Sequence, residues 1–203
     1  MVFNCFPMLD WLKAIDTHIF LAINGAHNGF LDIIMFWASE KWIWIPLYLL
    51  FVYLLYLQFG KRTWFLVLLA GVVIVFTDQT SVHLFKFVFH RPRPCHEPEL
   101  AGLVHLVNGK CGGPYGFISS HAANSFGLAT YLSLLMGKKL RFFTPLILIW
   151  AFLLCYSRVY LGVHYPGDVI VGAIWGAGLG AVIYSVTSLI LSDRTRINAD
   201  ATE

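Results

Sequence analysis

Long apolar stretches, separated by short polar breaks, dominate this chain. A transmembrane helix needs ~20 mainly apolar residues, or somewhat fewer at the low end of the range. Five stretches meet this requirement. They predict membrane-spanning helices over, roughly, residues 42–59, 63–89, 122–136, 143–161 and 169–191.

The first 40 residues have a different pattern. Residues 12–23 and 30–38 are apolar but short, and residues 24–28 interrupt them with small polar side chains. One kinked span fits this pattern, and so do two half-helices that lie in the membrane interface. We favour one span, which gives about six transmembrane helices.

The composition supports a membrane protein. Hydrophobic residues make up 58% of the chain and charged residues 12%, whereas an average soluble domain is about 45–50% apolar and about 25% charged. So little charge cannot cover a water-soluble globule, and lipid as the solvent removes that conflict. The net charge of +3 is small and scattered, which argues against a nucleic-acid partner. We expect a single all-α domain over residues 1–203, a polytopic membrane helix bundle.

Basic residues gather in alternate breaks between the predicted helices. Loops rich in Lys and Arg tend to face the cytoplasm, so we expect these breaks on the cytoplasmic side. They hold Lys61 and Arg62, then Lys138, Lys139 and Arg141, then Arg194 and Arg196. This orientation makes residues 90–120 an extracytoplasmic loop and residues 192–203 a cytoplasmic tail.

Three polar clusters fall on the opposite, extracytoplasmic side, at residues 86–94, 117–121 and 157–168. Three cations from the first and third clusters can neutralise a phosphate dianion, and Arg offers a planar fork to two oxygens. These cations are Lys86, Arg93 and Arg158. In the second cluster, Ser119 or Ser120 can cap the following helix, whose free amides attract an anion.

The same clusters supply groups for acid–base and nucleophilic chemistry. His164 and Asp168 are four residues apart, so the carboxylate can hold one imidazole nitrogen protonated and leave the other free as a nucleophile. His121 is a second imidazole, available as acid and base. Each signal alone is weak, because a lone Lys near a span end usually snorkels and a lone buried His is usually structural. The order and spacing of all three clusters together are specific.

The cysteines do not predict a metal site. No cluster offers the carboxylates that magnesium prefers or a three-ligand zinc set, so we expect no metal and no cofactor. Cys95 and Cys111 flank the polar loop on the oxidising side of the membrane, and we expect a disulfide between them. Two unpaired thiols are the alternative.

These residues resemble the type 2 phosphatidic acid phosphatase superfamily of membrane phosphatases. That family's pattern is Lys-x6-Arg-Pro, then Pro-Ser-Gly-His, then Ser-Arg-x5-His-x3-Asp. The first and third elements match fully, at residues 86–94 and 157–168. The second keeps Ser119 and His121 but has Ile118 in place of Pro and Ser120 in place of Gly.

The resemblance implies a role for each matched residue. The phosphate would be bound by Lys86, Arg93, Ser119, Ser120 and Arg158. His164 would attack phosphorus, with Asp168 orienting it, and His121 would protonate the leaving oxygen and then activate water.

The resemblance also implies substrates and a location. The substrate would be a lipid phosphate or pyrophosphate, with undecaprenyl pyrophosphate favoured narrowly over phosphatidylglycerol phosphate, and phosphatidic acid also open. The compact chain resembles bacterial members, which implies the cytoplasmic membrane with the site facing the periplasm. A lipid phosphotransferase with the same residues, or a non-catalytic lipid transporter or lipid-binding protein, stays open.

Overall fold

The structure is a computed structural model that describes the backbone of residues 7–200 and the side chains of residues 8–192. The described chain is helical and has no strand, so the predicted all-α membrane bundle is confirmed. Its long helices are α1 (Pro7–Gly25), α2 (Gly29–Ser39), α3 (Ile45–Phe59), α4 (Thr63–Thr80), α6 (Ser120–Met136), α7 (Phe143–Tyr160) and α8 (Pro166–Asp200).

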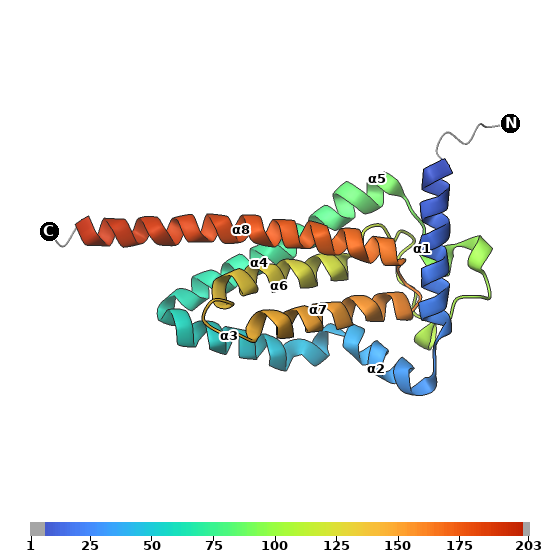
Figure 1. Cartoon of the computed structure of the whole chain (residues 1–203), viewed down its shortest axis with the longest axis horizontal. Helices are drawn as coiled ribbons and strands as arrows, with labels where there is room; N and C mark the ends of the chain where they lie inside the picture. Colours follow the sequence, from blue (N-terminus) through green and yellow to red (C-terminus); the bar gives the residue numbers. More distant parts are fainter. Residues whose placement is uncertain (1–6, 201–203) are drawn as a thin grey trace.

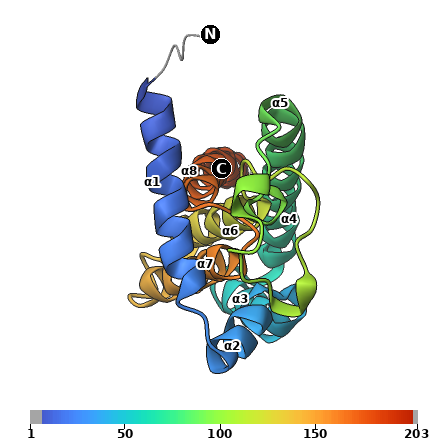
Figure 2. The ribbon, with the colours of Figure 1, turned by 90° about the vertical axis from the view of Figure 1, so that its right-hand side faces the viewer.

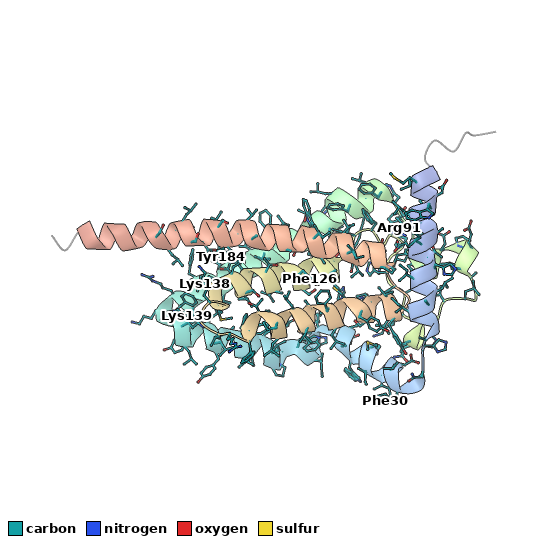
Figure 3. The ribbon with its side chains drawn as sticks, in the orientation of Figure 1. Phe30, Arg91, Phe126, Lys138, Lys139 and Tyr184 are labelled. Carbon is teal, nitrogen blue, oxygen red and sulfur yellow. A yellow bond between two sulfur atoms is a disulfide. The ribbon has the colours of Figure 1, made fainter. Side chains whose placement is uncertain are left out.

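The bundle consists of α3, α4, α6, α7 and α8, which run along the long axis of the molecule, while α1 crosses one end (Figure 1). Figure 2 looks onto that end and shows α1 beside the loop between α5 (Phe87–Phe89) and α6. The basic turns lie at the opposite end, where Figure 3 labels Lys138 and Lys139. Arg194 and Arg196 belong to α8, but their side chains lie outside the described residues.

Within the described part of the chain, three helical stretches are long and apolar enough to cross a membrane: Lys41–Phe89, Phe143–Tyr160 and Pro166–Ser192. The first contains two predicted spans, because a turn at Gly60 with a positive φ of 54° separates α3 from α4. The predicted span at 122–136 corresponds to α6, a 17-residue helix in the middle of the bundle.

The first 40 residues form two helices rather than one continuous one. α1 and α2 are bent by 115° relative to each other, and together they are apolar enough to cross a membrane as one broken span. Asn28 caps α2 by accepting a hydrogen bond from the Leu31 amide at 2.9 Å, which starts a new helix there. Buried Asn24 fixes the end of α1 by donating to the carbonyl oxygens of His105 and Tyr160 at 2.9 and 2.7 Å.

Small residues bring α6 and α8 close together. A methyl group at Gly176 would lie 2.0 Å from the Ala123 carbonyl oxygen, and one at Gly180 would lie 2.3 Å from that of Gly127. Only glycine leaves room for such an approach, and small residues at helix contacts are typical of membrane bundles. The contact fixes the start of α6 against the start of α8, where two of the polar clusters lie.

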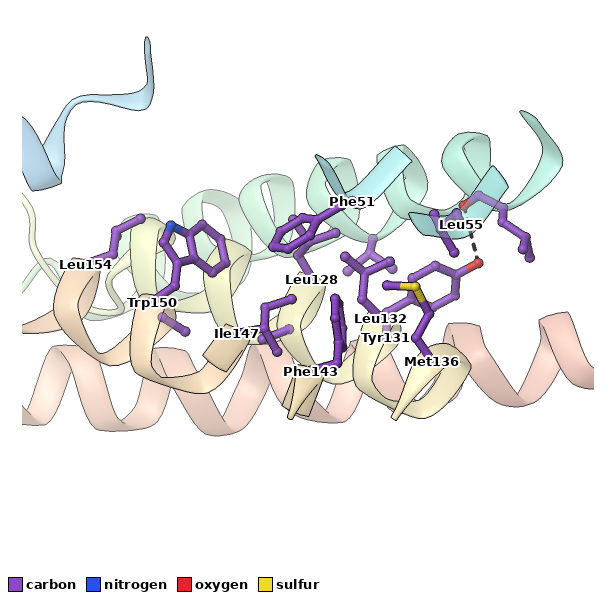
Figure 4. Packing of buried hydrophobic residues seen from close by; sticks show 14 residues of the cluster. Phe51, Leu55, Leu128, Tyr131, Leu132, Met136, Phe143, Ile147, Trp150 and Leu154 are labelled. Atoms are coloured by element: carbon purple, nitrogen blue, oxygen red, sulfur yellow. Dashed lines mark hydrogen bonds between the residues drawn. The ribbon is translucent and has the colours of Figure 1, made fainter. Parts of the chain in front are cut away.

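An aromatic and aliphatic core fills the rest of the bundle (Figure 4). Trp150 packs edge-to-face against Phe51, and Phe51 against Phe143, with ring centroids 6.3 and 5.7 Å apart. The hydroxyl of buried Tyr131 donates to the Leu66 carbonyl oxygen at 3.3 Å, so its polar end is satisfied. This core holds the helices that carry the polar clusters.

Candidate active site

Lys86 ends a π-helical turn, Ser81–Lys86, that continues α4. Such wide turns inside helices occur frequently at functional sites, because they reorient the side chains that follow. Lys86 Nζ donates a hydrogen bond to Ser120 Oγ at 2.8 Å, and Ser81 Oγ lies 2.6 Å from the same oxygen. The first and second polar clusters are therefore in direct contact.

Ser119 caps α6, since its side chain accepts a hydrogen bond from the Ala122 amide. Its own amide donates to the Asp168 carbonyl oxygen at 2.9 Å, which joins the start of α6 to the start of α8. His121 follows in the first turn and is exposed. Among the described side chains His121 has no hydrogen-bond or ion-pair partner, so its imidazole is free to meet a ligand.

His164 and Asp168 are both buried, with 1% and 0% of their surface exposed. Nδ1 of His164 lies 3.5 Å from Oδ2 of Asp168, while Oδ2 also accepts a hydrogen bond from the Tyr165 amide at 3.0 Å. The second contact is half of a capping box, in which the third helical residue reaches back to the N-cap. Helix capping therefore holds the carboxylate on the Nδ1 side, and Nε2 is the nitrogen left for chemistry.

The turn before His164 depends on Gly162, whose φ is 77°. A methyl group there would lie 2.7 Å from a Val104 methyl group and 2.8 Å from the His105 carbonyl oxygen. Both the left-handed conformation and the close approach favour glycine. The turn carries the chain from α7, which ends at Tyr160, directly to the buried imidazole.

Two arginines complete the site. The NH1 nitrogen of Arg93 lies 3.3 Å from His164 Nε2 and donates to the Val163 carbonyl oxygen at 3.2 Å. Arg158 donates to the Ser39 hydroxyl on α2. Both arginines line a cavity of about 230 Å³. The Nε atoms of both are buried without a hydrogen-bond partner among the described residues.

The charge balance of this site is incomplete. Within residues 8–192, no carboxylate forms an ion pair with Lys86, Arg93 or Arg158. Three partly buried cations without a counter-ion are costly, and a bound anion removes the cost. The arrangement therefore suits a dianion such as a phosphate group.

The electrostatics favour a neutral, nucleophilic imidazole. Burial lowers the pKa of His164 well below its usual value of 6.5, and the positive charges of Arg93, Arg158 and Lys86 lower it further. Contact with the Gly116 backbone acts in the opposite direction but does not outweigh these effects. At neutral pH the ring can therefore attack without first losing a proton.

A disulfide between Cys95 and Cys111 closes the loop that begins beside Arg93, with the two Cα atoms 6.0 Å apart. His96 lies next to this bridge, and these three residues are the one group of metal-ligand type that lies together in the described chain. Because the two sulfurs are bonded to each other, they are not available as thiolate ligands.

Two residues at this end of the molecule were not predicted. Arg91 forms ion pairs with Asp168 and with Asp16 of α1, at 2.8 and 2.7 Å. Arg91 had a signal in the sequence, because it begins the run Arg-Pro-Arg-Pro. Asp16 had none, since nothing in the pattern indicates that α1 crosses the end of the bundle.

Comparison with known proteins gives a consistent result. The model of the PAP2 superfamily matches residues 61–190. The chain is 40% identical over 181 residues to a lipid A 4'-phosphatase of Bacteroides thetaiotaomicron, covering 88% of this chain and 80% of that protein. It is 34% identical over 179 residues to a lipid A 4'-phosphatase of Porphyromonas gingivalis, covering 88% of this chain and 75% of the relative.

Solved structures agree. The crystal structure of Aquifex aeolicus LpxE superposes with a TM-score of 0.60 at 27% identity, covering 84% of this chain and 95% of that one. A PAP2-type phosphatidylglycerolphosphate phosphatase from Bacillus subtilis shares the fold, with a TM-score of 0.64 at 20% identity over 88% and 87% of the two chains. This chain belongs to the PAP2 superfamily and is a membrane phosphatase acting on phosphoric esters.

Proposed function

We propose that this enzyme hydrolyses the phosphate monoester of a membrane lipid through a phosphohistidine on His164. The observation that carries the proposal is the incomplete charge balance around the buried His164–Asp168 pair. Three cations without carboxylate partners surround a neutral imidazole, as a phosphate substrate requires. Lys86, Arg93 and Arg158 would neutralise the dianion, with Ser119 and the first amides of α6 helping to bind it.

The reaction has two steps. Nε2 of His164 attacks phosphorus, the bond to the lipid oxygen breaks, and that oxygen takes a proton from His121. In the second step His121 accepts a proton from water, whose oxygen attacks phosphorus and displaces His164 as free phosphate leaves. Asp168 stays ionised and stabilises the positive charge that develops on the imidazole. Lys and Arg supply the charge neutralisation, so neither step calls for a divalent ion.

For the substrate we propose a phosphorylated sugar lipid of the lipid A class. Two relatives that the chain largely covers are named for that activity. The cavity beside Arg93 and Arg158 supports a bulky polar headgroup, because Glu40 and Lys110 also line it and offer both an acceptor and a donor to hydroxyl and amide groups. Undecaprenyl pyrophosphate and phosphatidylglycerol phosphate, the substrates favoured in the sequence analysis, rest only on the family resemblance.

The test uses purified enzyme in detergent and a panel of lipid phosphates. The panel holds lipid A bisphosphate, undecaprenyl pyrophosphate, phosphatidylglycerol phosphate and phosphatidic acid, and free phosphate is the readout. We expect the highest kcat/KM with lipid A, undiminished after exhaustive EDTA treatment. His164→Asn should abolish release with every substrate, whereas His18→Asn, at an exposed position on α1, should match the wild type.

Four results would argue against the proposal. A preference for undecaprenyl pyrophosphate or phosphatidylglycerol phosphate would refute the proposed substrate class but not the phosphohistidine mechanism. Label transferred to a second lipid rather than to water would identify a phosphotransferase. Full activity of His164→Asn, or activity lost with EDTA and restored by magnesium, would refute the mechanism itself.

A further inference from the structure

The Arg91 guanidinium bridges two carboxylates that come from opposite ends of the chain. Its NH1 nitrogen donates to Oδ1 of Asp168 at 2.8 Å, and its NH2 nitrogen donates to Oδ2 of Asp16 at 2.7 Å. The guanidinium also stacks on the Tyr165 ring, 4.1 Å from the ring centroid. Figure 3 labels Arg91 at the end of the bundle that α1 crosses.

Asp16 also contacts the N-terminus of α8 directly. Its Oδ1 atom accepts a hydrogen bond from the Gly167 amide at 2.7 Å, in the first turn of that helix. A methyl group at Gly167 would lie 2.8 Å from Oδ2 of Asp16, so glycine permits the approach. Asp16 thus binds Arg91 through Oδ2 and the first turn of α8 through Oδ1.

We propose that Asp16 and Arg91 are a positioning pair that holds the Asp168 carboxylate in line with His164. The proposal rests on the proposed function, in which His164 is the nucleophile. It places α1, which lies outside the family match at residues 61–190, in the catalytic machinery. Neither Asp16 nor Arg91 needs to touch substrate, because both act through Asp168.

The two oxygens of Asp168 explain why the pair matters. Oδ2 faces Nδ1 of His164 and accepts from the Tyr165 amide, so Oδ1 is the oxygen left to fix the carboxylate plane. Arg91 binds that oxygen. Without it, a fully buried carboxylate would lose its ion-pair partner and could rotate away from the imidazole.

The charges support an ion pair that stays formed. Burial lowers the pKa of Arg91, but the carboxylates of Asp168 and Asp16 outweigh that effect and raise it above the usual value. The planar fork is also essential, because a lysine offers a single ammonium and cannot reach two separate carboxylates with fixed geometry. Arg91→Lys is therefore expected to restore little of the lost activity.

The test is a double-mutant cycle on kcat and KM, with whichever lipid phosphate the wild type hydrolyses. Asp16→Asn keeps an oxygen for the Gly167 amide but removes the charge and replaces the oxygen that accepts from Arg91 with an amide nitrogen, which cannot accept. We expect kcat to fall about tenfold. For Arg91→Gln we expect a fall of about 10²-fold, as small misplacement of catalytic groups produces. The double variant should equal Arg91→Gln within about twofold, because both changes act on the same carboxylate.

Three readouts separate positioning from a structural effect. KM and the inhibition constant of inorganic phosphate should stay within about twofold of wild type. Neither residue needs to touch the substrate, and independent sites usually affect each other by no more than about twofold. Asp10→Asn, an exposed carboxylate on the same helix, is the matched control and should leave kcat unchanged. If Arg91→Gln does not fold, Asp16→Asn alone tests the proposal, because positioning predicts a lower kcat with an unchanged KM.

The proposal fails if Asp16→Asn leaves kcat unchanged, if the two effects add, or if the loss appears in KM. Each of these results is meaningful only while His164→Asn is inactive. If His164→Asn hydrolyses lipid phosphate, the proposed function has failed instead. The two failures are therefore distinguishable in one set of variants.

Discussion

Lys86 donates its hydrogen bond to the hydroxyl of Ser120, 2.8 Å away, at the position where the family motif usually has glycine. Ser81 lies 2.6 Å from the same oxygen. The departure from the motif therefore has a structural use, because a hydroxyl at this position holds the cation that we propose binds phosphate.

Replacement of Ser120 by alanine is expected to raise KM about tenfold. A hydrogen bond to a charged group contributes about 1.5 kcal/mol at the low end of its range, and 1.4 kcal/mol is a factor of ten in binding. The matched control is Ser133→Ala, on the same helix, whose hydroxyl has no partner among the described residues. An unchanged or lowered KM in Ser120→Ala would show that Lys86 is positioned without the hydroxyl.

Loss of the disulfide is expected to destabilise the enzyme. The bridge closes a segment with a sequence separation of 16, and cross-linking a loop of that size contributes roughly 3 kcal/mol in the chain-entropy model, often less in practice. Cys95→Ser and Cys111→Ser should each lower Tm in detergent, and the double variant should be no worse than either. Additive losses, or two alkylatable thiols in a non-reduced digest of oxidised protein, would contradict a bridge in solution.

The site is expected to face the periplasm, because basic turns lie at the other end of the bundle. The test places a single cysteine in a variant whose native cysteines are serine. A membrane-impermeant thiol reagent should label Gly113→Cys in intact spheroplasts, and Lys139→Cys only after permeabilisation. Both positions are exposed, so accessibility alone does not favour one. The reverse pattern would invert the topology.

The sequence indicated the candidate site residues but not the contacts that hold them in place. Lys86, His121 and His164 were identifiable because scarce polar groups in an apolar chain stand out, and because each adjoins a predicted span on the same side. Local periodicity is sufficient for this inference. The close contact of α6 with α8, which brings the second and third clusters together, is seen only in the structure.

The rest depends on long-range geometry. The 115° bend between α1 and α2 turns α1 across the end of the bundle, and Asp16 reaches Arg91 only because of it. The π-helical turn that ends at Lys86 is likewise invisible in a hydropathy pattern, because it is a change in backbone hydrogen bonding that the polarity of its residues does not encode. Features set by packing between distant segments leave little trace in local sequence.

The lowered pKa of His164 predicts a pH-dependent stability. Between its usual value of about 6.5 and its lower folded value, the unfolded chain binds a proton that the folded enzyme does not. Stability is therefore complete above about pH 6.5 and is lost as the pH falls, by at most ~1.4 kcal/mol per pH unit for this group. Tm in detergent should fall less between pH 7.5 and 5.5 in His164→Asn than in wild type or His18→Asn. Parallel decreases in all three would contradict the lowered pKa.

The central claim divides the work between two histidines, and trapping the phosphoenzyme tests it most directly. His121→Ala should still be phosphorylated by an activated ester such as p-nitrophenyl phosphate, because a good leaving group needs little protonation. It should then stall, because the same residue activates water, and labelled phosphate should accumulate on the protein in an acid-labile, base-stable form.

The control is the His121→Ala, His164→Ala double variant, which should carry no label. With the natural lipid, His121→Ala should lose at least ~10²-fold in kcat, the lower end of what general acid–base catalysis provides. The account predicts label on His164 in the single variant alone. Equal losses with both leaving groups and no trapped intermediate, or label found on His121 of an active His164→Ala enzyme, would contradict it.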